Sequence, residues 1–205
     1  MFDARLRVLK DKLFDPVARA LPFVSPGFVT ALALVVGLGA VVALWEGRFG
    51  WGLVFWLGNR VLDGLDGSVA RVQGRSSDLG GYVDLLADFV VYGAIPVVLA
   101  LRPGADPTLV ASALVLLVTF YVNAASWMVL AAILEKRRHG AEARGEPTSI
   151  SIPEGVISGT ETVVFYTLFF VLPAQQGVLF TLMAGLTALT VLQRLVWARR
   201  ALGTS

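Results

Sequence analysis

The stretch "DGLDGSVARVQGRSSDLGGYVDLLAD", residues 63–88, places four aspartates between two long apolar segments. Charged side chains are costly near hydrocarbon, so acids beside apolar segments mark candidate functional sites. Spacings of three and four residues put each pair of acids on one face of a helix. We expect the short loop between the helices to bring the two pairs together. The four acids are Asp63, Asp66, Asp84 and Asp88.

The apolar segments predict an all-α polytopic membrane protein. The 205-residue chain is 56% hydrophobic and only 16% charged, and it repeats apolar segments of about 20 residues, the length that spans a bilayer. Continuous apolar runs favour helices over a barrel, whose strands alternate. We predict one domain over residues 1–205, with a bundle over 26–200. Its six transmembrane helices lie near 26–45, 50–70, 80–101, 107–134, 154–172 and 177–197.

Residues 1–22 have the pattern of an amphipathic helix on a membrane surface. Apolar residues recur at helical spacing, and basic residues occupy the other faces. The alternative is a helix that packs in a soluble domain. The apolar positions are Phe2, Leu6, Leu9, Leu13 and Val17.

Basic residues predict the orientation of the bundle. Arg48 and Arg102 fall on one side. All other basic residues except Arg60 lie in the amino-terminal segment, the 71–75 loop, the 136–144 cluster and the carboxyl-terminal region. By the positive-inside rule, both termini and the 63–88 stretch face the cytoplasm.

Four converging carboxylates repel one another and resist ionisation. Mg²⁺ or Mn²⁺ would resolve this conflict, because hard divalent cations prefer oxygen ligands. Two such ions can clamp a phosphate that undergoes displacement. The alternative is a set of salt bridges or helix caps, but only Arg60, Arg71 and Arg75 are near in sequence. The chain has no cysteine and one histidine, which disfavours other metal centres.

The residues between the acids fit a ligand site. Gly67 and Gly80 allow close backbone approach by a ligand, Ala70 keeps the next helical turn small, and Arg71 supplies a planar fork for phosphate oxygens. Small residues in membrane helices more often serve helix packing. Their joint placement among four acids favours the ligand site.

The pattern Asp63-x2-Asp66-Gly67-x2-Ala70-Arg71-x8-Gly80-x3-Asp84-x3-Asp88 resembles the signature of the CDP-alcohol phosphatidyltransferases without a gap. The resemblance extends to the architecture, a surface helix followed by six membrane helices. It implies an enzyme that displaces CMP from a CDP-linked lipid, with an acceptor hydroxyl as nucleophile, in phospholipid biosynthesis. It further implies a homodimer in the cytoplasmic membrane of a bacterium.

The resemblance also implies roles for individual residues. Asp63, Asp66 and Asp84 would bind two Mg²⁺ or Mn²⁺ ions, and Asp88 would bind metal and deprotonate the acceptor. The residues that match contacts to the CDP group are Gly67, Ala70, Arg71, Ser77 and Gly80.

Two regions depart from the family pattern. Many relatives begin the first membrane helix with Thr-Pro-Asn, where this chain has Ser25-Pro26-Gly27. Relatives that use phosphorylated polyols often carry arginines at the cytoplasmic end of the fourth helix, where this chain has residues 123–127, "NAASW".

The acceptor alcohol stays open at the level of sequence. A phosphorylated polyol such as glycerol 3-phosphate, which we favour, needs cations of the kind found at Lys136, Arg137 and Arg138. Serine or another amino alcohol would instead use Glu154 or Glu161. Glu161 is expected inside an apolar span, where it would shape the acceptor pocket or pair with a basic residue such as Arg194. The Gly-x-Glu-Thr stretch around it resembles bacterial members without an assigned acceptor.

A different class of function is an ion-coupled membrane transporter, because carboxylates on broken helices also bind ions. A transporter needs no Gly-Ala-Arg frame for a nucleotide. The basic residues follow the topology instead of forming a patch with exposed aromatics, so we expect no nucleic-acid partner.

Overall fold

The computed structural model describes residues 13–142 and 155–203, and at residues 138–142 it describes the backbone alone. Within these ranges the chain is helical and contains no strand. Residues 13–20 form a short first helix. Six longer helices follow, with a 3-10 turn between the last two. They are α2 (Pro26–Trp45), α3 (Phe49–Val72), α4 (Asp78–Leu101), α5 (Pro107–Glu142), α6 (Gly159–Val171), the turn η1 (Pro173–Gln175) and α7 (Gln176–Leu202).

Local signals in the sequence define the helix ends. Ser25 caps α2 by accepting a hydrogen bond from the Phe28 N–H at 3.2 Å, and Pro26 occupies the first helical turn, where its missing N–H costs nothing. Ser77 caps α4 in the same way. Glycines with positive φ follow α2, α3 and α4, a conformation that glycine adopts at no steric cost. They are Gly47, Gly74 and Gly104.

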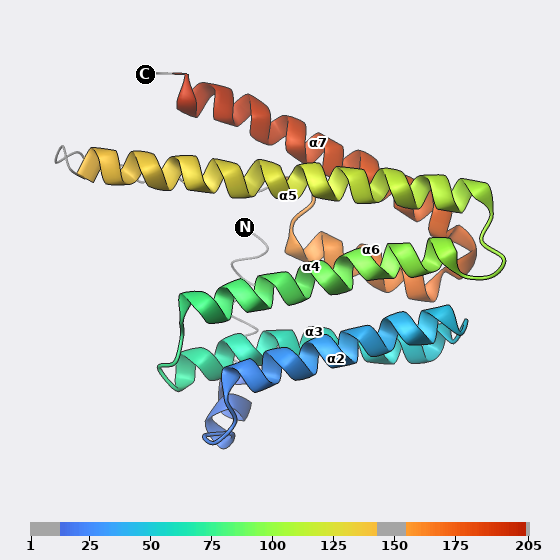
Figure 1. The fold of residues 1–205 in the computed structure, drawn as a ribbon, viewed down its shortest axis with the longest axis horizontal. Helices are drawn as coiled ribbons and strands as arrows, with labels where there is room; N and C mark the ends of the chain where they lie inside the picture. Colours follow the sequence, from blue (N-terminus) through green and yellow to red (C-terminus); the bar gives the residue numbers. More distant parts are fainter. Residues whose placement is uncertain (1–12, 143–154, 204–205) are drawn as a thin grey trace.

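Consecutive helices from α2 to α7 run in opposite directions and form a bundle (Figure 1). α2 packs against both α3 and α4, α5 packs against α7, and α6 packs against α3. The α3–α4 connection, the last residues of α5 and the end of α7 lie at one end of the bundle, at the left of Figure 1. The α2–α3, α4–α5 and α6–α7 connections lie at the other end. The helix ends and connections whose basic residues predict one common side of the membrane therefore lie at the same end of the bundle.

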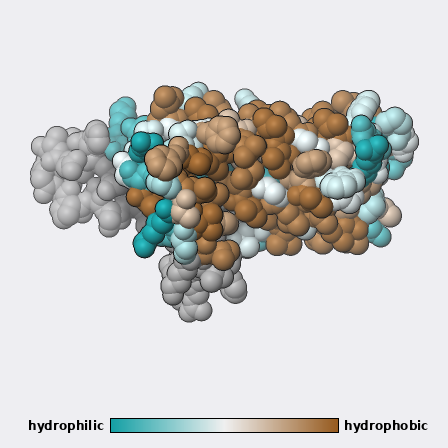
Figure 2. Space-filling view, turned by 90° about the horizontal axis from the view of Figure 1, so that it is seen from below, coloured by the Kyte–Doolittle hydropathy of each residue, from teal (hydrophilic) through white to brown (hydrophobic). Residues whose placement is uncertain are grey.

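Among the described residues, four helical segments are long and apolar enough to cross a membrane. An apolar band separates polar ends on the face shown in Figure 2. The four segments are Pro26–Trp45, Asp78–Leu101, Pro107–Arg137 and Pro173–Leu202. α6, with 13 residues, is shorter, and about 1.5 Å per residue makes it shorter than the hydrocarbon core is thick. α3 is long enough at 24 residues but contains Arg60, Asp63, Asp66 and Arg71. All six predicted helices thus exist, and four meet the criteria for spanning.

An aromatic cluster fills the centre of the bundle. Trp56 of α3 stacks on Tyr166 of α6 with ring centroids 5.3 Å apart, and Tyr92 of α4 meets Tyr166 edge-on at 4.8 Å. The Tyr166 hydroxyl donates a hydrogen bond to the Tyr92 carbonyl at 2.6 Å. The Trp56 indole donates to the Thr167 hydroxyl at 3.1 Å. Each buried polar atom of these large rings therefore has a partner.

Two predicted boundaries are corrected. α6 begins at Gly159 instead of 154, because Ser158 and Glu161 form a capping box that starts the helix there. α5 continues to residue 142, beyond the predicted end at 134. For the predicted surface helix, residues 13–20 are helical and expose Leu13 and Val17. Its residues 1–12 and also Glu154 lie outside the described part of the chain.

Candidate active site

A cavity of about 480 Å³ opens where α2 begins, α3 ends and α4 begins. Seven residues predicted from the sequence line it: Asp66, Gly67, Ala70, Arg71, Ser77, Gly80 and Asp84. Pro26, Gly27 and Thr30 of α2 complete one wall. The tertiary structure therefore brings together residues up to 58 positions apart, from Pro26 to Asp84.

The amino terminus of α4 forms one side of this cavity. Ser77 accepts a hydrogen bond from the Gly80 N–H at 3.1 Å, and a hydroxyl that accepts in this way can still donate its proton. Backbone N–H groups and the helix dipole favour an anion at such a terminus. Arg71 and Arg75 also line the cavity. The arrangement suits a phosphorylated ligand.

The two signature glycines keep the cavity open next to these polar groups. A Cβ atom on Gly67 would lie 3.3 Å from Nη1 of Arg71. A Cβ on Gly80 would lie 3.1 Å from the Ser77 hydroxyl. A side chain at either position would therefore crowd a polar group that lines the cavity.

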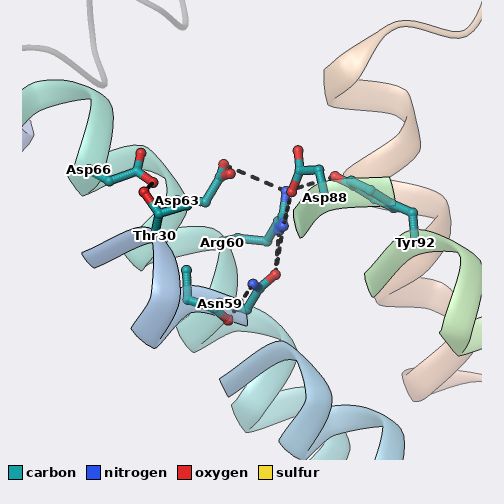
Figure 3. Close-up of polar contacts among 8 residues, drawn as sticks. Thr30, Asn59, Arg60, Asp63, Asp66, Asp88 and Tyr92 are labelled. Carbon is teal, nitrogen blue, oxygen red and sulfur yellow. Dashed lines mark hydrogen bonds and ion pairs between the residues drawn. The ribbon is translucent and has the colours of Figure 1, made fainter. Parts of the chain in front are cut away.

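Thr30 orients Asp66. The Thr30 hydroxyl donates a hydrogen bond to Oδ2 of the buried Asp66 at 2.7 Å (Figure 3). The same hydroxyl lies 3.2 Å from the Pro26 carbonyl, so the shorter contact to the carboxylate dominates. This contact ties the start of α2, where the chain lacks the usual asparagine, to the acids on α3.

Asp63 and Asp88 lie one helical turn beyond Asp66 and Asp84 and contact Arg60 (Figure 3). Nη2 of Arg60 donates to Oδ1 of Asp88 at 2.7 Å, and Nη1 lies 3.6 Å from Oδ2 of Asp63. The salt-bridge alternative therefore describes Asp63 and Asp88. One guanidinium carries a single positive charge for these two carboxylates, so the pair keeps a negative charge that favours a cation.

The donor set fits hard divalent cations. Asp63, Asp66, Asp84 and Asp88 supply only carboxylate oxygens, the ligands that Mg²⁺ and Mn²⁺ prefer. The guanidinium of Arg60 between Asp63 and Asp88 shows that a cation is accommodated between two of these acids. In the described part of the chain, no three acids are gathered as a preformed metal site. Metal ions would therefore have to draw the four side chains together.

The residues predicted for the acceptor lie elsewhere. Glu161 is in the first turn of α6, not deep in an apolar span, and its carboxylate accepts hydrogen bonds from the Ser158 N–H and hydroxyl. Arg137 donates to the carbonyls of Ala201 and Leu202 at the end of α7, and Lys136 is exposed. The side chain of Arg138 lies outside the described residues.

The sequence predicted no role in ligand binding for four further residues; Arg60 and Arg75 were weighed only as salt-bridge partners, and Arg194 only as a partner of Glu161. Thr30 and Arg75 line the cavity, and Arg60 binds the two deeper acids. Arg194 of α7 is buried and donates to the Asn123 side chain at 2.9 Å and the Ser126 hydroxyl at 3.2 Å. For Arg60 and Arg194, the signal in the sequence was a charged residue within an apolar helix.

Comparisons with known proteins show which sequences are similar to this chain. A sequence model described as CDP-alcohol phosphatidyltransferase matches residues 23–196. Inner membrane protein YnjF of Escherichia coli (strain K12) is 29% identical over 201 residues, covering 97% of this chain and 95% of that protein. CDP-diacylglycerol–serine O-phosphatidyltransferase of Mycobacterium leprae (strain TN) is 35% identical over 75 residues, which cover 37% of this chain and 25% of that protein.

Solved structures share the fold. Phosphatidylinositol phosphate synthase (PgsA1) of Mycobacterium tuberculosis with CDP-DAG bound has a TM-score of 0.70 at 22% identity, covering 90% of this chain and 92% of that chain. The same protein in complex with manganese and citrate has a TM-score of 0.66 at 23% identity, with coverage of 89% and 87%.

Proposed function

The chain belongs to the CDP-alcohol phosphatidyltransferase family, and from this premise we propose that it displaces CMP from CDP-diacylglycerol with the hydroxyl of a phosphorylated polyol. Membership in the family makes it a transferase of substituted phosphate groups and argues against the alternative of an ion-coupled transporter. The observation that carries the proposal is the cavity at the start of α4. It combines two acids, an anion-binding helix terminus and two arginines.

The proposed reaction makes one bond to phosphorus and breaks another. Asp88 accepts the proton of the acceptor hydroxyl, and the acceptor oxygen forms a bond to the lipid-linked phosphorus. The bond from that phosphorus to the CMP oxygen breaks, and CMP leaves. A carboxylate within hydrogen-bond reach is suited to this proton transfer. Two Mg²⁺ or Mn²⁺ ions, held by Asp63, Asp66, Asp84 and Asp88, would supply charge neutralisation for the diphosphate.

The donor proposal rests on the polar and apolar walls of the cavity. Arg71, Ser77 and the α4 terminus provide contacts for a diphosphate. Leu79 and Val83 line the same cavity and are 72% and 47% exposed, so apolar surface leads from the polar cavity along α4. Such a site suits a ligand with a nucleotide and acyl chains. The PgsA1 structure with CDP-DAG bound adds support.

Arg71→Lys should weaken donor binding with little change in kcat. The ammonium is a point charge and replaces the bidentate guanidinium poorly, and one lost charge-assisted hydrogen bond corresponds to about 10-fold in affinity. KM for CDP-diacylglycerol and direct donor binding provide the measurement. Arg48→Lys, at the α2–α3 connection beside Glu46, is the matched control. A loss confined to kcat would contradict the role in donor binding.

A phosphorylated polyol is favoured as acceptor by two observations. The Glu161 carboxylate is engaged in the capping box, which argues against its use for the amine of serine. Nε of Arg194 is buried without a hydrogen-bond partner among the described residues. Asp88, Asn123 and Arg194 lie at similar depths in the bundle. Each is about 20 to 27 Å along its helix from the end of the bundle opposite the α3–α4 connection, at about 1.5 Å per residue. Arg194 is therefore a candidate cation for an acceptor phosphate.

An acceptor panel with purified protein tests the function. We expect CMP release and a new lipid with CDP-diacylglycerol, Mg²⁺ or Mn²⁺, and glycerol 3-phosphate or inositol phosphate. Serine, inositol and ethanolamine should give no product, and Glu161→Gln should not change the preference. Release of CMP and the mass of the lipid product are measured together. Product with serine alone, lost in Glu161→Gln, would overturn the polyol and assign Glu161 to the acceptor.

We further propose that the single membrane domain spans residues 1–205, with six crossings and both termini in the cytoplasm. The distribution of Lys and Arg supports this topology, and the apolar helices and the inner membrane relative support a bacterial cytoplasmic membrane. Residues 1–22 would lie on the membrane surface. We also propose a homodimer, for which the family resemblance is the support.

A further inference from the structure

Arg60 is a charged residue in the middle of α3 whose side chain is only 12% exposed. Its guanidinium contacts groups on two helices. Nε and Nη2 donate to Oδ1 of Asn59 at 2.9 and 2.6 Å, and Nη2 also donates to Asp88 at 2.7 Å. Nη1 donates to the Tyr92 hydroxyl at 2.9 Å and lies 3.6 Å from Asp63. All three guanidinium nitrogens are therefore engaged (Figure 3).

Aromatic rings hold the guanidinium in place. Its central carbon lies 4.9 Å from the ring centroids of both Trp56 and Tyr92. Helical spacing explains the arrangement, because Trp56 and Asp63 flank Arg60 on one face of α3, and Asp88 and Tyr92 share one face of α4. A planar guanidinium can stack on rings and donate from its edge at the same time, which an ammonium cannot do.

Asn59 connects this arrangement to α2. Its Nδ2 donates to the Ala33 carbonyl at 2.8 Å, while its Oδ1 accepts from Arg60. A chain of hydrogen bonds thus runs from the backbone of α2 through Asn59 and Arg60 to Asp88 on α4. Arg60 does not line the cavity that holds the proposed nucleotide contacts. Its contacts point to the deeper acids instead.

We propose that Arg60 is a positioning residue for Asp88. It engages Oδ1 of Asp88 and fixes the carboxylate on the side of α4 that faces α3, so that the other oxygen is directed for proton transfer. The acceptor hydroxyl approaches an acid whose rotamer is already set by α2, α3 and α4. This inference rests on the proposed function, because it assigns Asp88 as the base.

The test compares Arg60→Gln, Arg60→Lys and Tyr92→Phe with the wild-type enzyme. Outer partners that orient a ligand typically contribute 10- to 100-fold, so Arg60→Gln should lower kcat by about that factor with KM for CDP-diacylglycerol unchanged. Arg60→Lys keeps the positive charge but loses the planar guanidinium with its several donors, so its kcat should lie between those of Arg60→Gln and the wild-type enzyme. Tyr92→Phe removes one acceptor of Arg60 and should give a smaller loss of kcat alone.

Mn²⁺ binding to protein without substrate gives a readout besides turnover. Removing a positive charge next to Asp63 and Asp88 does not disfavour a cation, so Arg60→Gln should bind Mn²⁺ at least as tightly as wild type, measured by calorimetry. Arg102→Gln is the matched control. Arg102 also stacks on an aromatic ring, Phe49 at 4.9 Å, and donates to Gln176, at the opposite end of the bundle.

The outcomes separate the two proposals. An unchanged kcat per folded molecule in Arg60→Gln, or equal losses of kcat in Arg60→Gln and Arg102→Gln, would overturn the positioning role. Thermal unfolding of each variant measures the folded fraction. If Arg60→Gln does not fold, Tyr92→Phe decides, because unchanged kcat there with normal folding overturns the inference. If the wild-type enzyme releases no CMP with any acceptor, the proposed function itself fails.

Discussion

Asp88→Asn is expected to reduce kcat by at least about 100-fold, the usual contribution of a general base, while CDP-diacylglycerol still binds. The amide keeps the size of the carboxylate, and its oxygen can still accept the hydrogen bond that Arg60 gives to Oδ1 of Asp88 at 2.7 Å. The Arg60 contacts therefore survive the substitution. The amide cannot take the proton of the acceptor hydroxyl, so the chemical step fails.

The measurement pairs turnover with donor binding. kcat comes from CMP release, and affinity comes from binding of CDP-diacylglycerol to purified protein with Mn²⁺. Asp78→Asn is the matched control, because Asp78 is an exposed acid in the first turn of the same helix and does not line the cavity. If Asp88→Asn loses donor affinity and retains kcat, Asp88 serves as a ligand and another group is the base.

Asp66→Asn is expected to weaken Mn²⁺ binding by at least about 10-fold, since even outer partners of a metal ligand contribute that much, and to abolish most turnover. The Thr30 hydroxyl that donates to Oδ2 of Asp66 at 2.7 Å can donate equally to the amide oxygen. Folding is therefore retained while the negative charge is lost. Asp63→Asn and Asp84→Asn should show the same combined loss, because each removes one carboxylate from the set.

Calorimetry with Mn²⁺ and CMP release give the two readouts. Asp106→Asn is the control, because Asp106 accepts backbone hydrogen bonds at the start of α5 and asparagine caps helices as well as aspartate does. Excess chelator should abolish wild-type turnover. Full activity in chelator would refute the metal-dependent mechanism, and a loss of turnover with normal Mn²⁺ affinity in Asp66→Asn would remove that residue from the ligand set.

The number of helices and the end of the bundle at which the signature lies followed from local information. Runs of apolar residues, broken by glycine, proline and charged groups, are read within one segment of the chain, so the six helices and the end of the bundle that carries the signature were predicted. The boundary of α6 was misplaced because the apolar pattern was followed instead of the Ser158-x-x-Glu161 spacing, which is a local signal for a capping box. The apolar pattern around residue 154 does not reveal it.

The signature determined the family and a set of residues that line one cavity. Fixed spacings on two helices joined by a short loop leave few ways to arrange Asp66, Gly67, Arg71, Gly80 and Asp84, and all of them line one cavity. Only the tertiary structure decided which groups from other segments join them. Thr30 reaches Asp66 across 36 residues, and Arg60 reaches Asp88 across 28. Such contacts depend on how α2, α3 and α4 pack, and neither periodicity nor spacing within a helix specifies that packing.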